Sequence, residues 1–104
     1  MTEVLQKGTV ESLVVAMRDR LENVTDLSLL TNKFFDVKKK SDGSSVQSSV
    51  PWVVDPDFPM EAICEIDTTL SGYVGGEYYK LYLRYSSGSE SPVKGPLVFR
   101  VEDD

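Results

Sequence analysis

Two segments near the end of the chain alternate regularly in polarity. In the first, residues 78–85, one set of alternate positions is apolar and the other is aromatic or basic: Tyr79, Leu81, Leu83 and Tyr85 against Tyr78, Lys80, Tyr82 and Arg84. In the second, the apolar positions are Leu97, Phe99 and Val101. Because successive side chains of a strand point to opposite faces, each segment predicts a half-buried strand. Turn-forming residues lie between them, so together they predict the last hairpin of a β-sandwich.

The middle of the chain divides into further short segments with strand patterns. Strands are predicted at 33–40, 46–54 and 60–67, and an Asp-Gly pair after the first of them favours a hairpin turn. Pro51 lacks the N–H that a central strand needs, so it indicates a sheet edge or a bulge. The number and spacing of these segments predict an all-β fold, a seven-stranded antiparallel immunoglobulin-like β-sandwich.

Residues 9–23 fit two patterns. Helical spacing is shared by Val10, Leu13, Val14, Met17 and Leu21, and strand alternation by Leu13, Val15 and Met17. We favour a strand at about 12–18, because a helix would leave the sandwich one strand short, but the choice between strand and helix stays open. A turn at 19–23 follows, then a connection with about one helical turn in which Leu27, Leu29 and Leu30 cover the end of the core.

The length of the chain sets its domain organisation. With 104 residues, 40% of them hydrophobic and 27% charged, the chain has the size and composition of one globular domain. We expect residues 1–8 to form an N-terminal arm or edge strand and residues 9–104 to form the sandwich domain. The first residues lack a basic segment followed by an apolar one, so export through a signal peptide is not expected.

Charge and cysteine content restrict the partners and the compartment. The chain has 17 acidic and 11 basic residues, a formal net charge of -6, which repels phosphate backbones and anionic lipids. We therefore expect neither nucleic acid nor a membrane as a partner. Cys64 is the only cysteine, so no disulfide can form within the chain.

The residues that usually carry catalysis are scarce. The chain has no histidine, and Cys64 lies on the apolar side of a predicted strand with no base near it in sequence. Asp55, Asp57 and the acidic residues 102–104 carry oxygen ligands but lack the spacing of a calcium loop. We therefore expect no enzymatic activity, no cofactor and no metal site.

Aromatic and basic residues are the candidates for binding. We expect Trp52 to belong to the core, and Tyr79 to hydrogen-bond back to the preceding loop as the tyrosine of a tyrosine corner. Tyrosine and arginine are enriched at the centres of protein interfaces. The predicted contact residues are Tyr73, Tyr78, Lys80, Tyr82 and Arg84.

Several segments together resemble a known family. They are 24–27 (Val-Thr-Asp-Leu), 35–37 (Phe-Asp-Val), 41–43 (Ser-Asp-Gly), 64–68 (Cys-Glu-Ile-Asp-Thr), 76–83 (Gly-Glu-Tyr-Tyr-Lys-Leu-Tyr-Leu) and 91–101 (Ser-Pro-Val-Lys-Gly-Pro-Leu-Val-Phe-Arg-Val). In these the chain is similar to small immunoglobulin-like virion proteins of tailed bacteriophages, including connector and decoration proteins. It also resembles the N-terminal immunoglobulin-like domain of phage baseplate upper proteins.

The resemblance implies a non-enzymatic structural subunit, made in the host cytoplasm and located in the virion. It would lie at the head-to-tail connector or neck, on the tail or on the capsid surface. Its partners would be portal, connector, tail or capsid subunits, together with further copies of itself. The alternative is a binding module for host glycans or a receptor, in which Trp52, Tyr73, Tyr78 and Tyr82 stack against sugars.

Overall fold

The computed structural model describes residues 3–17, 27–86 and 93–103. The predicted turn at 19–23 lies outside these residues. The described residues form eight strands: β1 (Glu3–Gln6), β2 (Val10–Ala16), β3 (Thr31–Lys39), β4 (Ser45–Pro51), β5 (Val53–Val54), β6 (Glu61–Asp67), β7 (Tyr78–Ser86) and β8 (Val93–Glu102). A short 3₁₀ turn, η1 (Leu27–Leu29), precedes β3.

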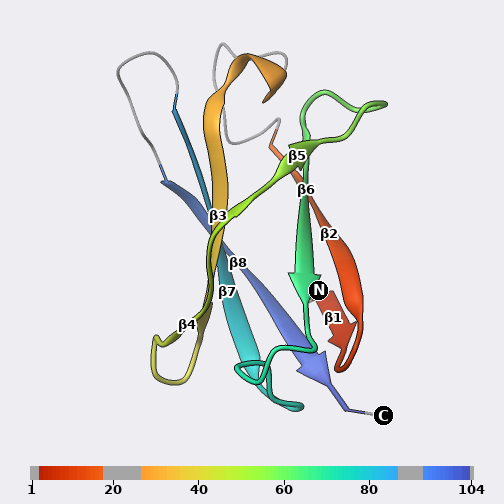
Figure 1. Cartoon of the computed structure of the whole chain (residues 1–104), viewed down its shortest axis with the longest axis vertical. Helices are drawn as coiled ribbons and strands as arrows, with labels where there is room; N and C mark the ends of the chain where they lie inside the picture. Colours follow the sequence, from red (N-terminus) through yellow and green to blue (C-terminus); the bar gives the residue numbers. More distant parts are fainter. Residues whose placement is uncertain (1–2, 18–26, 87–92, 104) are drawn as a thin grey trace.

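The strands form two sheets that pack as a sandwich, as predicted (Figure 1). One sheet has the order β1-β8-β7-β3-β4 and the other the order β2-β6-β5. The pairs are antiparallel except for β1 and β8, which run parallel, so the prediction of a wholly antiparallel sandwich is corrected. The first and last strands of the chain lie side by side, because β1 pairs with β8.

The strand predicted at 46–54 is two strands in different sheets. Residues 45–51 pair with β3 at the edge of the five-stranded sheet, where Pro51 was expected to lie, and residues 53–54 pair with β6 in the other sheet. Trp52 lies between them and is only 2% exposed, with its indole N–H donating to the carbonyl of Arg84 at 3.1 Å. This crossing is why the described residues hold more strands than the predicted seven.

The ambiguous segment near the N-terminus is a strand. Leu13, Val15 and Met17 are buried while Val10 and Val14 are about half exposed, the alternation of a strand and not of a helix. All seven residues of β2 pair with β6. The cross-strand hydrogen bonds and the second layer of the sandwich therefore outweigh the helical spacing of the same residues.

The first segment is an edge strand. Leu5 of β1 is buried, and the chain then turns at Gly8, whose φ of 90° suits glycine. The Lys7 ammonium donates to the carbonyls of Thr68 and Leu70, both at 2.8 Å. These contacts tie β1, which lies at the edge of the five-stranded sheet, to the loop after β6.

The leucines of the connection before β3 do not all reach the core. Leu27 and Leu30 are buried, whereas Leu29 is 74% exposed, so the prediction for Leu29 is wrong. In a 3₁₀ turn residues three apart lie on the same side, which places Leu27 and Leu30 together and turns Leu29 towards solvent.

Tyrosines close the end of the core near the start of β7. The Tyr79 hydroxyl accepts a hydrogen bond from the Val74 N–H at 2.6 Å and donates one to the Gly72 carbonyl at 3.1 Å, as predicted for this residue. The ring of Tyr79 lies 4.9 Å from that of Tyr73 and 5.6 Å from that of Phe99. The loop between β6 and β7 is thereby fastened to the core.

Replacing Tyr79 with phenylalanine tests this fastening. Tyr79→Phe keeps the ring and removes both hydrogen bonds, so we expect the free energy of unfolding to fall by about 1–2 kcal/mol. Urea unfolding followed by circular dichroism measures the change. Tyr82→Phe is the control, because its hydroxyl has no protein partner among the described residues; an equal loss in both variants would contradict this role of Tyr79.

Candidate functional site

The outer face of the five-stranded sheet gathers most of the predicted contact residues. Tyr78, Lys80, Tyr82 and Arg84 of β7 all point away from the core, because the residues between them are buried. Neighbouring strands add further outward side chains. We call this surface the basic face; it comprises Tyr78, Lys80, Tyr82, Arg84, Phe34, Asp36, Lys38, Lys40, Val98, Arg100 and Glu102.

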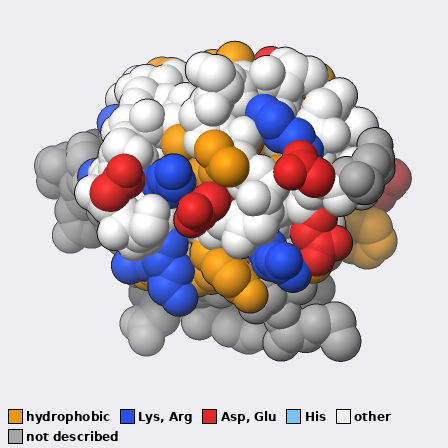
Figure 2. Space-filling model, turned by 90° about the horizontal axis from the view of Figure 1, so that it is seen from below, with side chains coloured by type: hydrophobic (Ala, Val, Ile, Leu, Met, Phe, Trp, Pro, Cys, Tyr) orange, Lys and Arg blue, Asp and Glu red, His pale blue; other side chains and the backbone are white. Residues whose placement is uncertain are grey.

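At one end of the basic face, Tyr78 lies between two cations. The Arg100 guanidinium is 5.9 Å from the centre of its ring and the Lys40 ammonium 5.6 Å. Arg100 also pairs with Glu102 at 2.7 Å. Seen from this end of the molecule, hydrophobic side chains lie among Lys and Arg and also Asp and Glu side chains (Figure 2). Tyr78 is 42% exposed, so its ring is held in place by its neighbours yet open to a partner.

In the middle of the basic face two lysines lie directly opposite each other. Lys80 of β7 and Lys38 of β3 are paired across the sheet, an arrangement that like charges normally destabilise. The Lys38 ammonium lies 5.9 Å from the centre of the Tyr82 ring. In the described part of the chain, no carboxylate forms an ion pair with Lys38, Lys40 or Lys80.

At the other end, Arg84 is held by a carboxylate. Its Nε lies 2.6 Å from Asp36 Oδ2, and its Nη2 donates to Ser49 Oγ at 2.7 Å. Burial alone would raise the pKa of Asp36, but a hydrogen bond from the Ser49 N–H and the Arg84 guanidinium together lower it. An open hollow of about 370 Å³ is lined by Asp36, Lys38, Tyr82 and Arg84.

Two of the aromatic residues proposed for binding are buried. Tyr73 is 1% exposed and its hydroxyl donates to the side-chain oxygen of Gln47, so its prediction as a contact residue is wrong. The same oxygen accepts from the Asp67 N–H at 3.3 Å, which links β4 to β6 between the two sheets. Trp52 is also buried, as the core prediction required, and neither ring can stack against a sugar.

The outer face of the three-stranded sheet has a different composition, which the sequence interpretation missed. We call it the acidic face; it comprises Val10, Ser12, Val14, Ala16, Val53, Glu61, Ile63, Glu65 and Asp67. Val14, Ile63 and Val53 form one row across the three strands. None of the three strands contains a lysine or arginine. The alternation of residues 61–67 carries this signal, because its outward positions are Glu61, Ile63, Glu65 and Asp67.

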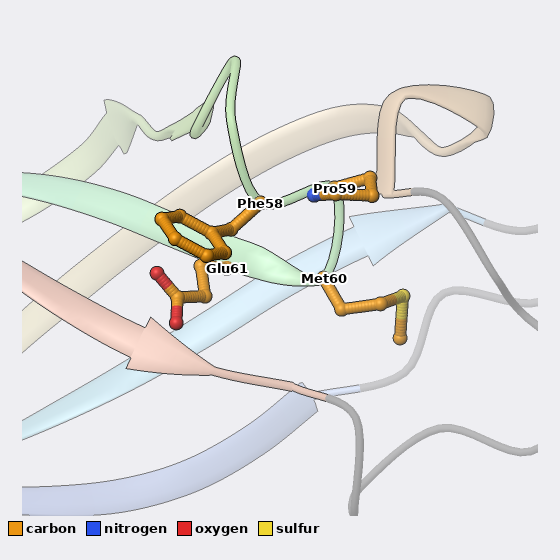
Figure 3. Close-up of a pocket in the computed structure, with 4 residues that line it drawn as sticks. All are labelled: Phe58, Pro59, Met60 and Glu61. Carbon is orange, nitrogen blue, oxygen red and sulfur yellow. The ribbon is translucent and has the colours of Figure 1, made fainter.

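An apolar hollow lies at one end of the acidic face. It measures about 150 Å³ and is lined by Phe58, Pro59, Met60 and Glu61. Figure 3 shows the Phe58 ring beside the Glu61 side chain, with Met60 pointing away from both. Phe58 is 54% exposed, so an apolar surface and a carboxylate are presented together.

The remaining candidate groups are not brought together. Cys64 is buried in the core, and burial raises the pKa of its thiol to about 12. Among the residues that the structure describes, no three His, Cys, Asp or Glu side chains are grouped as metal ligands, Asp55 and Asp57 included. No helix in this part of the chain is long and apolar enough to span a membrane.

Comparisons of the chain with models of protein families, with curated proteins and with solved structures found no match.

The buried thiol yields a test of the core around Cys64. Because the folded protein disfavours the thiolate, we expect a disulfide reagent to label Cys64 at pH 8 only as fast as the protein unfolds. Urea should release the thiol. The unfolded chain loses this proton above about pH 9 while the folded protein keeps it, so the free energy of unfolding should fall as the pH rises past that value.

The control for this labelling is Ser12→Cys in a Cys64→Ser background. Ser12 is exposed on the neighbouring strand β2, so its replacement should react at once without urea. Equally fast labelling of native Cys64 would contradict its burial.

Proposed function

We propose that this chain is an immunoglobulin-like structural subunit of a tailed-phage virion, with no enzymatic activity, that acts by protein–protein assembly through its basic face. The strand order supports the immunoglobulin-like part. Strands β1-β8-β7-β3-β4 correspond to A′GFCC′ and β2-β6-β5 to BED of that fold. Tyr79 has the tyrosine-corner bonds, and Leu81, two residues later, stands where antibody domains have the second cysteine.

The basic face is the observation that carries the assembly function. It combines two exposed or half-exposed tyrosines with three lysines that form no ion pair with a carboxylate among the described residues. Tyrosine and arginine provide much of the binding energy of protein interfaces. Tyr78 between its two cations, and Arg84 between Asp36 and Ser49, are already ordered, so binding would cost little further side-chain entropy.

The proposed setting follows from the family resemblance and from the single buried cysteine. A domain that needs no disulfide can fold in the reducing host cytoplasm and enter the particle there. The proposed location is the head-to-tail connector or neck, or else the tail or capsid surface. The partners would be portal, connector, tail or capsid subunits.

A second candidate is a module that binds host glycans or a receptor. The hollow beside Tyr82 favours it, because an aromatic ring there lies next to the polar groups of Asp36 and Arg84. Sugar recognition uses an aromatic surface for stacking together with placed polar groups. Of Trp52, Tyr73, Tyr78 and Tyr82, only the last two lie on the outer face of the sheet.

The assembly function is tested in the particle. We expect mass spectrometry to detect the chain in purified virions of the phage that encodes it. Particles complemented with the double variant Lys80→Glu, Tyr82→Ala should contain several-fold less of it. The control is Lys39→Glu, which makes the same charge change as Lys80→Glu at a β3 residue outside the basic face. Absence of the wild-type chain from virions would refute the proposal.

The glycan alternative is tested separately. If it holds, a glycan array gives reproducible binding that Tyr82→Ala reduces about tenfold or more, since stacking contributes through the ring. Tyr82→Phe should bind nearly as well. Binding that is unaffected by Tyr82→Ala would rule out this hollow as the glycan site.

A further inference from the structure

We propose that the basic face of one copy docks on the acidic face of a second copy of the same chain. This rests on the proposed function in taking the basic face as the contact surface, and it names the partner. The two faces lie on opposite sides of the sandwich (Figure 1). A contact between them is therefore head-to-tail, and repetition gives a ring or a filament and not a closed pair.

Charge is divided between the two faces. The chain has a net charge of -6, yet the basic face carries five cations and two carboxylates, both of which pair with an arginine. The acidic face carries Glu61, Glu65 and Asp67, with no lysine or arginine on its three strands. Within one molecule these charges cannot meet, because the core separates them. Between two copies they are complementary, which favours and orients the encounter.

The two faces also match in form. Each has a central strand with a row of outward residues: β7 offers Tyr78, Lys80, Tyr82 and Arg84, followed by Ser86, and β6 offers Glu61, Ile63, Glu65 and Asp67. Alternate residues of any strand are about 6.6 Å apart, so cations and carboxylates on facing strands have the same spacing. The apolar row Val14, Ile63 and Val53 provides a surface for the tyrosine rings.

The hollow at Phe58 suits a basic side chain. A lysine that enters it would lay its apolar stem along the Phe58 ring and bring its ammonium to Glu61 (Figure 3). The basic face supplies such side chains in Lys38, Lys40 and Lys80, which form no ion pair with a carboxylate among the described residues. This hollow is the most specific element of the proposed contact.

One rival contact between copies is available. β2 lies at the edge of the three-stranded sheet, and among the described residues no strand pairs with its outer side, the side away from β6. Its seven residues include neither lysine nor proline. Two such edges could pair and extend the three-stranded sheet. That contact would give a closed dimer and would depend little on salt, so its behaviour differs from the one we propose.

The experiment uses charge reversal on the full chain. Sedimentation velocity at about 0.5 mM protein and low salt should show the wild type self-associating, with association lost near 0.5 M NaCl. Variant one, Lys38→Glu with Lys80→Glu, reverses the basic face. Variant two, Glu61→Lys with Glu65→Lys, reverses the acidic face. Each alone should bind itself at least tenfold more weakly than the wild type. Unchanged circular dichroism and melting temperatures show that both variants fold.

Mixing the two variants gives the decisive result. The reversed basic face of variant one then meets the reversed acidic face of variant two, so association should return. Phe58→Ala should weaken wild-type association about tenfold. A monomeric wild type, or association that persists in each variant alone, would overturn the proposal, and a salt-resistant dimer would indicate the β2 edge instead. If virions contain the chain but the purified wild type is monomeric, only this inference is refuted, and the proposed structural role stands.

Discussion

The alternation of side chains across the strands is the constraint on which both surfaces depend. Aromatic residues fix it from the inside: Tyr79, Phe99 and Trp52 are buried, and each sets which neighbours point outwards. A shift of one residue in β7 would bury Lys80 and expose Leu81. The burial of the core therefore determines the composition of the outer faces, and the free energy that fixes the register is hydrophobic and not electrostatic.

Much of the fold could be predicted because the alternation of apolar and polar residues is visible in the sequence of its strands. The segments around Leu81 and Phe99 did so without ambiguity, and Tyr79 followed from its place after a turn. The crossing of the chain from one sheet to the other at Trp52 could not be predicted. Pro51 indicates a sheet edge equally well whether the chain stays in its sheet or leaves it. The parallel pairing of β1 was equally hidden, since a short apolar segment does not specify which strand it joins.

The residues of the basic face were predicted along one strand and missed across strands. Tyr78, Lys80, Tyr82 and Arg84 share a face because they are two residues apart, a relation that sequence displays. Lys38 and Arg100 join them only through strand pairing, which depends on distant segments. Tyr73 fails for a related reason. It lies in a loop, where side chains do not alternate, and its hydroxyl donates a hydrogen bond to the buried Gln47, which is far away in sequence.

The opposed lysines at the centre of the basic face support a role for that surface. Lys80 and Lys38 repel each other across β7 and β3, and Lys38 is near groups that offset this repulsion, the Tyr82 ring and the Asp36 carboxylate. A sequence selected for stability alone would place an acidic residue at one of these positions, since a cross-strand pair of opposite charges is favourable. Natural proteins break such local rules mainly where function requires it. An acidic partner would relieve the repulsion, because its carboxylates would lie against both lysines at once.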